Sequence, residues 1–317
     1  MPTHLISPLV ALGFVVCWSS GFVGGRLALE STLPVFTLFA WRFLLAGSMT
    51  GVWWYISAPV LFNRRELVQE VGVGSLTMGG YLLGVILAIQ LGVSAGVTAL
   101  IAALQPLLAA ALAGPWLGEK LSRLGWAGMA VAAGGVVLCV LDDVGKGGDV
   151  PLWAYALPLL SVVSVTLGSL VSVNRRAALP MAPTLTMQLL AATLVFSVAA
   201  LIDGGGEIQW LTTEPVTLSA IAWLIVLSSL GGYGFFVTSL RRLGVTTTST
   251  LVYLTPPVTL VWAALMFGEF PGPNGMIGMG VAIAGVALAM LSGRGRHQEN
   301  DSILPRYAGH AGHAGGA

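Results

Sequence analysis

Arg42 is the only charged residue that lies well inside a long apolar stretch of the sequence. A charge at such a place is costly, so its side chain should face protein, water or a partner group. A guanidinium presents a planar fork of N–H donors, which suits a substrate carboxylate or phosphate. The alternative is a structural or gating role, in which Arg42 bonds the carbonyl groups of a neighbouring broken helix.

Two polar clusters next to prolines, Gln105-Pro106 and Thr255-Pro256-Pro257, occupy matched places in the two halves of the chain. A proline inside a helix removes one hydrogen bond and clashes with the carbonyl one turn earlier, so each helix should kink and free backbone acceptors. Such interruptions at corresponding places indicate the binding site of a transporter. We therefore expect both clusters, together with Tyr253, to line a cavity. The alternative is that the kinks only improve helix packing.

Aromatic and hydroxyl side chains inside the apolar stretches supply further candidates for the cavity wall: Trp18, Ser20, Tyr81, Ser164 and Tyr233. Such a lining could hold a small zwitterionic or amphipathic solute through hydrogen bonds and ring contacts. The alternative for the serines is to hold helices together, which is frequent in membranes.

Acidic and metal-binding residues are placed differently. No Asp, Glu, His or Lys lies near the middle of an apolar stretch, so a buried carboxylate that couples transport to protons is not expected. Glu119 and Glu269 end two stretches and are expected to be plain interfacial carboxylates, although a gating role is conceivable. No metal or other cofactor is expected, because the sequence has no CxxC or HExxH spacing.

The composition requires a membrane protein to position these residues. The chain of 317 residues is 56% hydrophobic and 9% charged, with a mean hydropathy of +0.88, and its net charge of +1 provides no basic face for nucleic acid. Ten apolar stretches approach the roughly 20 residues that a helix needs to cross a bilayer. Their approximate bounds are Ser7 to Gly25, Pro34 to Ser57, Leu67 to Leu91, Ala95 to Trp116, Leu124 to Leu141, Leu152 to Val173, Pro183 to Ile202, Val216 to Leu240, Thr246 to Phe267, and Asn274 to Leu291.

The chain repeats itself at about half its length. Residues 102–141 superpose on 252–291 at a shift of 150, and Gly79-Gly80-Tyr81 superposes on Gly231-Gly232-Tyr233 at a shift of 152. Such self-similarity indicates two fused copies of one unit. We expect an N-terminus over 1–6, a first repeat over 7–141, an outer linker over 142–151, a second repeat over 152–291 and a disordered tail over 292–317.

Loop charges predict the orientation. With a cytoplasmic N-terminus, eleven Lys and Arg residues fall on the cytoplasmic side and two, Arg26 and Lys146, fall outside. Both termini are then cytoplasmic. Five helices per repeat is an odd number, so the second copy enters the membrane from the opposite side. Inverted repeats of this kind recur in secondary transporters, with the substrate site where the halves meet. The fold class predicted is an all-α polytopic membrane protein with ten transmembrane helices in two inverted five-helix repeats.

Several motifs together resemble the EamA-type branch of the drug/metabolite transporter superfamily. They are Trp18-Ser19-Ser20-Gly21-Phe22, Phe39-Ala40-Trp41-Arg42-Phe43, residues 92–106, and the pairs Gly118-Glu119 and Gly268-Glu269. The resemblance implies a central substrate cavity, efflux of small metabolites such as amino acids, and a possible homodimer or peripheral packing through the fifth and tenth helices. It also places Arg42 in a generic motif, so we favour its structural or gating role.

The sequence thus predicts a permease of a bacterial inner (plasma) membrane that moves a small-molecule substrate by alternating access. A carrier of nucleotide sugars or phosphorylated metabolites is an alternative, for which Arg42 alone provides little positive charge. A non-transporting scaffold or a lipid-flipping accessory subunit is another. An intramembrane enzyme is not expected, because no nucleophile with its base and no carboxylate pair lies at membrane depth.

Overall fold

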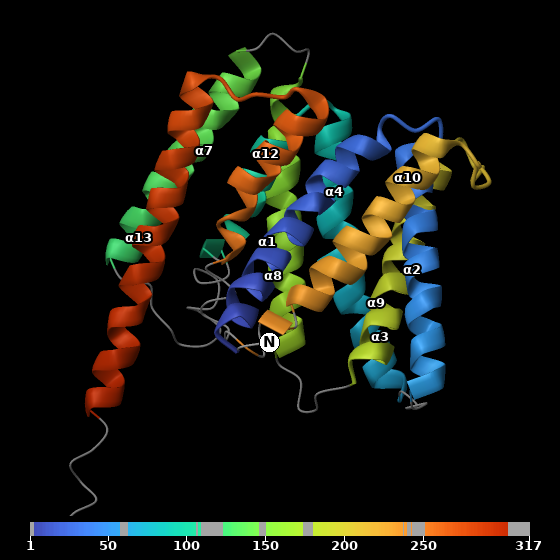
Figure 1. The fold of residues 1–317 in the computed structure, drawn as a ribbon, viewed down its shortest axis with the longest axis horizontal. Helices are drawn as coiled ribbons and strands as arrows, with labels where there is room; N and C mark the ends of the chain where they lie inside the picture. The colour runs from blue at the N-terminus through green and yellow to red at the C-terminus, as the bar shows by residue number, and fades with distance from the viewer. Residues whose placement is uncertain are drawn as a thin grey trace, which may run out of the picture.

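The computed structural model describes residues 3–57, 63–105, 107–108, 123–145, 150–173, 180–236, 238–239, 242 and 251–303. All regular structure in this part of the chain is helical, as Figure 1 shows. Seven helices are long and apolar enough to cross a membrane, and two shorter apolar helices cover Thr255–Phe267 and Pro273–Leu288. The expected stretches Ala95 to Trp116 and Thr246 to Phe267 lie partly outside the described residues, so the count of ten stays a prediction.

The first half contains six described helical elements that follow from the apolar stretches, interrupted where glycines cluster. They are α1 (Thr3–Ala28), α2 (Val35–Ser57), α3 (Arg64–Gly74), η1 (Ser75–Gly80), α4 (Tyr81–Gln90) and α5 (Ala95–Ala102), and α7 (Arg123–Gly145) ends this half. Asn63 starts α3 with a capping box, in which its side chain and that of Glu66 satisfy each other's backbone N–H groups.

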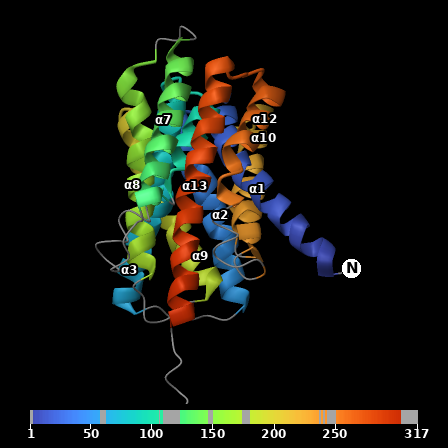
Figure 2. The ribbon, with the colours of Figure 1, turned by 90° about the vertical axis from the view of Figure 1, so that its left-hand side faces the viewer.

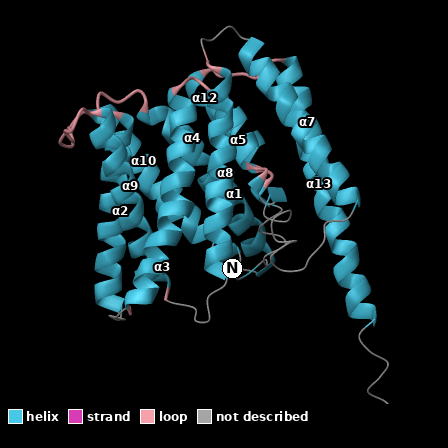
Figure 3. Ribbon diagram, turned by 180° about the vertical axis from the view of Figure 1, so that it is seen from behind, coloured by secondary structure: helices cyan, strands magenta, loops and turns pink. Residues whose placement is uncertain are grey.

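The second half repeats this pattern. Its described elements are η2 (Leu152–Tyr155), α8 (Ala156–Val173), α9 (Met181–Asp203), α10 (Pro215–Trp223), η3 (Leu224–Gly232), α12 (Thr255–Phe267) and α13 (Pro273–Ile303). The family of helices forms one bundle, with α7 and α13 side by side at its edge (Figures 1 and 3).

Polar contacts bring one set of helix ends to a common face, which we call the far face because α1 begins at the opposite face, the N-terminal face. Thr32, between α1 and α2, bonds Glu214 before α10. Asp143 near the end of α7 bonds both Ser94 before α5 and Tyr155 before α8. The helix α1 therefore ends at the far face, whereas α8 begins there, so the first helices of the two halves run in opposite directions.

Both halves contain a widened, π-helical segment at the same place in the repeat. In η1, the N–H of Tyr81 donates to the carbonyl of Leu76, five residues earlier. The second segment, η3, likewise ends at Gly231-Gly232-Tyr233. π-helical turns are rare in proteins and are frequently found at functional sites. The matched segments therefore mark the third and eighth expected helices as candidates for the site.

The expected kink at Pro256 is wrong, and the structure shows a break instead. The helix α12 begins at Thr255, and Pro256 lies buried in its first turn after a turn at Tyr253 and Leu254. Proline is tolerated there because the first N–H groups of a helix have no intrahelical partner. In the first half α5 ends at Ala102 and helical residues resume at Gln105, whereas the expected kink at Pro106 lies outside the described residues.

The main core packs α2 against α9 through aromatic rings. Phe196 of α9 stacks on Phe39 with centroids 5.1 Å apart and contacts Phe43 at 5.4 Å. All three side chains are buried, and burial of such large apolar surfaces contributes dispersion contacts that lipid chains cannot match in density. This pairing holds the second helix of one half against the corresponding helix of the other.

A second close contact joins α7 to α13, which lie along each other in Figure 2. Gly135 of α7 faces the backbone of Ala282 and Gly278, and Gly285 of α13 faces the backbone of Ala132 and Gly128. Because glycine has no side chain, the two backbones can approach to van der Waals contact. The reciprocal arrangement of small residues explains why the glycines recur in both copies of the repeat.

We predict that Gly135→Ala lowers the midpoint of thermal unfolding in detergent, measured by tryptophan fluorescence. The added Cβ would overlap the backbone of Ala282 and Gly278, and overpacking of this kind costs roughly 1–3 kcal/mol. Gly134→Ala is the matched control, because a Cβ there meets nothing within 4 Å, and alanine favours a helix over glycine by about 1 kcal/mol. Equal midpoints for the two variants would contradict the close contact.

Candidate functional site

A cavity of about 530 Å³ lies between the two halves. Its size falls in the range of roughly 300–1,000 Å³ that small-molecule sites occupy. The described residues that line it come from α1, α2, α3, η1, α4, α8, α9 and η3, with further contributions from the residues that follow η3 and from Gln105 and Val252. The polar and aromatic members of this wall are Trp18, Arg42, Thr77, Tyr81, Gln105, Ser169, Ser172, Gln188, Ser228, Ser229, Tyr233 and Phe236.

The cavity extends towards the N-terminal face. Ser172 lines it and is the next-to-last residue of α8, which runs from the far face to the N-terminal face. Towards the far face, the described lining stops at Phe22 and Val85, more than a helical turn before α1 and α4 end. The site is therefore placed in the middle and in the N-terminal half of the bundle.

Arg42 is the charged residue of this wall and is only 3% exposed. Its Nε donates to Ser229 Oγ at 3.3 Å, and its Nη2 donates to Ser228 Oγ at 3.0 Å and to Ser229 Oγ at 3.1 Å. The guanidinium also lies over the rings of Phe39 and Phe43, 5.1 and 4.8 Å from their centroids. Arg42 on α2 is thus held by hydroxyl groups of η3 in the other half.

One end of this guanidinium remains available. Nη1 of Arg42 is buried and has no hydrogen-bond partner among the described residues. In the described part of the chain, both ion pairs use Arg26 and none uses Arg42. A buried charge without a carboxylate partner is costly, so an anionic group that entered the cavity would find a donor already oriented by the serines.

Aromatic rings form the wall near the N-terminal half of α1. Trp18 lies 6.2 Å from Tyr233 and 5.6 Å from Phe236 between ring centroids. Tyr81 and Tyr233, which follow the two π-helical segments, both line the cavity. These rings provide an apolar surface with hydroxyl groups at its edge, which suits an amphipathic solute.

The structure brings together five of the eleven expected site residues: Trp18, Arg42, Tyr81, Gln105 and Tyr233 all line the cavity. Pro106 lies outside the described residues. The remaining five, Ser20, Ser164, Tyr253, Thr255 and Pro256, are not among the residues that line it.

Backbone hydrogen bonds explain where several of these residues go. Ser20 donates to the carbonyl of Cys17 at 2.6 Å, and Thr255 donates to that of Val252 at 2.6 Å. Ser164 donates to the carbonyl of Leu76 at 2.8 Å, which joins α8 to η1. Ser164 therefore holds helices together, the alternative that the sequence had left open.

Sequence reasoning missed Gln188, Ser228 and Ser229. The two serines directly precede the repeated Gly231-Gly232-Tyr233, and this spacing was an available signal. Gln188 lies on α9 and donates through Nε2 to Glu70 Oε2 at 3.0 Å. Glu70 is 0% exposed, so a carboxylate is buried in α3, near the N-terminal face and away from the middle of the bundle.

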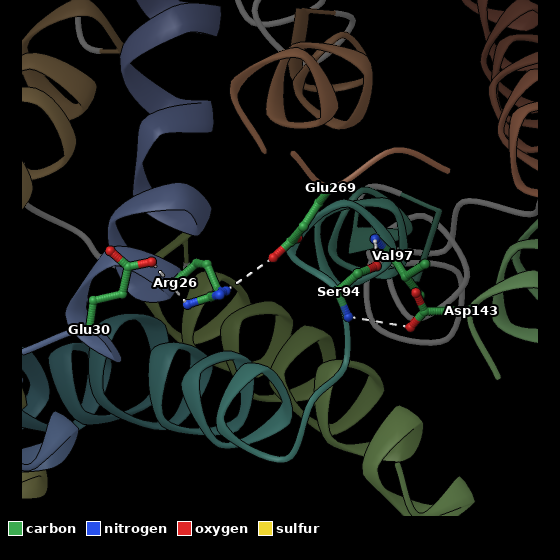
Figure 4. A network of polar contacts seen from close by, with 6 residues as sticks. All are labelled: Arg26, Glu30, Ser94, Val97, Asp143 and Glu269. Carbon is green, nitrogen blue, oxygen red and sulfur yellow. Dashed lines mark hydrogen bonds and ion pairs between the residues drawn. The ribbon is translucent and has the colours of Figure 1, made fainter. Parts of the chain in front are cut away.

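The far face is closed by polar contacts between the halves. Arg26 at the end of α1 forms an ion pair with Glu269, which follows α12, at 3.0 Å, and Figure 4 shows Arg26 lying between Glu269 and Glu30. Its guanidinium also lies 4.9 Å from the centroid of Phe267. Glu269 is therefore not a plain interfacial carboxylate, because it links the first helix of one half to the end of α12 in the other.

A second contact at the far face centres on Glu214. The hydroxyl groups of Thr32 and Thr217 donate to its Oε2 at 2.6 and 2.9 Å. These bonds hold the pKa of Glu214 below its ordinary value, with the Thr32 side chain the largest cause. A carboxyl group with a lowered pKa contributes stability above its unfolded-state pKa and loses it as pH falls through the folded-state value. The contact is therefore in place at neutral pH.

We predict that Arg26→Gln increases access to the cavity from the far face. The test uses a Leu82→Cys reporter in a Cys17→Ala, Cys139→Ala background and a membrane-impermeant maleimide added on the far-face side of sealed vesicles. Loss of a partly exposed ion pair, worth up to about 1 kcal/mol, should speed labelling by about two- to fivefold. Glu30→Gln is the control, because Glu30 lies 3.6 Å from Arg26 and is more exposed. Equal labelling in both variants would mean that the pair does not close this face.

Comparison with known proteins agrees with this arrangement. The model of the EamA-like transporter family matches residues 5–141 and 152–291. The chain is 36% identical over 88 residues to a protein of Streptantibioticus cattleyicolor described as a probable terminal-alkyne amino-acid exporter, and the match covers 27% of this chain and 30% of that protein. It is also similar to a solved crystal structure, with a TM-score of 0.64 and 20% identity over 91% of this chain and 97% of the other, which shows the fold alone. Because the family model matches both halves, the chain belongs to the EamA-like transporter family and is a multi-pass membrane protein.

Proposed function

We propose that the protein exports a small metabolite that carries a carboxylate, an amino acid being the leading class, through the central cavity. One observation carries this proposal: Arg42 lines the cavity, is held in place by Ser228 and Ser229, and keeps Nη1 without a partner among the described residues. The partial match to an amino-acid exporter supports the same substrate class.

The serine contacts give Arg42 two roles. They support the structural role that the sequence favoured, because they join α2 to η3. They also point the guanidinium at the cavity, where two-pronged binding of a carboxylate is its strongest interaction. Carriers of nucleotide sugars or phosphorylated metabolites need more positive charge, and Arg42 is the only cation among the described lining residues. The carboxylate is therefore the group that we assign to this site.

Transport by alternating access follows from the two faces of the bundle. The cavity extends towards the N-terminal face, and the contacts of Arg26 and Glu214 join the halves at the far face. We propose ten transmembrane helices in two inverted repeats, with both termini in the cytoplasm of a cell bounded by this inner membrane. The described conformation then faces the cytoplasm, ready to load a solute for export.

The apolar surface of the α7–α13 pair also supports an assembly proposal. Leu124, Trp126, Met276 and Ile277 are exposed on these edge helices. We propose a homodimer through this pair, as the resemblance of the sequence implied. Lipid would cover the same surface in a monomer, so the mass of the purified protein in detergent distinguishes the two.

We predict that liposomes containing the protein, preloaded with an amino-acid mixture, release a subset of these solutes, as measured by mass spectrometry with and without a pH gradient. Arg42→Gln should lower release at least about tenfold, because one hydrogen-bonded charge contact is worth about 1.5–3 kcal/mol. Arg64→Gln is the control, since Arg64 starts α3 and is exposed.

Retention of every solute by the wild-type protein would contradict the export proposal. Release that depends on neither arginine would leave transport in place but would remove Arg42 from the site. Release of phosphorylated metabolites in place of amino acids would favour the alternative carrier class.

A further inference from the structure

The helices α2 and α9 occupy corresponding places in the two halves. Both contain 23 residues, and both begin directly after a proline, Pro34 or Pro180. Superposing the two prolines places Gln188 on Arg42. Both residues line the cavity, and each bonds to the broken helix that crosses its own side of the site. Gln188 is thus the counterpart of Arg42 in the second half.

The contact with Glu70 fixes which end of the Gln188 amide faces the cavity. An ionised carboxylate can only accept hydrogen bonds, so Gln188 must give its NH₂ group to Glu70. The carbonyl oxygen at the other end of the amide, Oε1, is then left as an acceptor. No other described residue bonds to Gln188, and this side chain is part of the cavity wall. It therefore presents an acceptor to the substrate, whereas Arg42 presents donors.

Arg42 and Gln188 lie at different depths in the bundle. The helices α2 and α9 run antiparallel, and a Cβ on Gly47 would lie 3.5 Å from Leu189, whereas one on Gly51 would lie 3.5 Å from Thr186. This register places Gln188 level with the region of α2 between Gly47 and Gly51. Its backbone is thus about seven residues, or roughly 10 Å at 1.5 Å per residue, from that of Arg42.

We propose that Gln188, held by Glu70, is a second recognition point of the cavity, which binds a hydrogen-bond donor at the opposite end of the solute from its carboxylate. The inference rests on the proposed export of a carboxylate-bearing solute and specifies its class. The preferred substrate is an amino acid whose side chain ends in an N–H donor. The two charged groups on one α-carbon are too close together to reach both levels of the cavity.

Glu70 acts in this scheme as a positioning residue, because it touches Gln188 and does not line the cavity among the described residues. Its replacement by glutamine would permit either end of the Gln188 amide to face inwards, since a glutamine side chain both donates and accepts. Selectivity should then fall while the helix contact persists. A merely structural role of Glu70 would change the amount of folded protein and leave selectivity unchanged.

The test is competition between lysine and norleucine in the same proteoliposomes. Norleucine has the side-chain length of lysine without its terminal ammonium group. We expect wild-type protein to release lysine in preference to norleucine by at least about tenfold, the value of one hydrogen bond to a charged group. Gln188→Met should bring the ratio close to one, and Glu70→Gln should lower it part of the way. Gln90→Met, at the exposed far-face end of α4, is the matched control and should keep the wild-type ratio.

A ratio measured in one vesicle population separates selectivity from folding, because a folding defect lowers the release of both solutes together. Equal release of lysine and norleucine by the wild-type protein, or an unchanged ratio in Gln188→Met, would overturn the inference while leaving amino-acid export in place. Release of neither solute by the wild-type protein would overturn both this inference and the proposed function.

Discussion

Burial of the Arg42 guanidinium is the constraint on which the arrangement of the site depends. A charge at this depth has no water to solvate it, so neighbouring groups must supply hydrogen bonds and ring contacts. Ser228 and Ser229 supply the hydrogen bonds from η3, and Phe39 and Phe43 supply ring faces from the same helix as the arginine. The second helix of one half is thereby tied to the eighth expected helix in the other half. The cavity lies beside this junction.

The same junction relates the cavity to the two faces of the membrane. On the far face the halves meet through longer and more exposed contacts, such as the ion pair of Arg26 and Glu269. Exposed pairs of this kind contribute little energy each, so they can separate and re-form at small cost. The aromatic packing of α2 against α9 is buried and continuous. The bundle therefore combines a strongly packed pair of helices with weak contacts at one face, which suits a motion that opens that face.

Much of the fold could be predicted from the sequence, because apolar stretches of bilayer length and a repeat at half the chain are regular patterns. The same repeat located Tyr81 and Tyr233 at the cavity. It could not show that the helices before these tyrosines widen to π geometry, since a shift of one residue in hydrogen bonding leaves no mark in composition. Ser20 and Thr255 were misplaced because a hydroxyl in a helix can bond a carbonyl of its own chain. The pair of Gln188 and Glu70 depends on how α9 meets α3, which no local pattern contains.

The π-helical segments also bear on which changes of length the chain can tolerate. Each wide turn holds one more residue than an α-helical turn would, and an α-helix advances by 100° per residue, as 3.6 residues per turn require. Removing a single residue within η1 or η3 would let the segment close to an α-helix and would rotate everything on one side of it by about that angle. Tyr81 or Tyr233 would then leave the wall of the cavity. Descendants of this chain can therefore exchange side chains in these segments freely, but each segment has a fixed length.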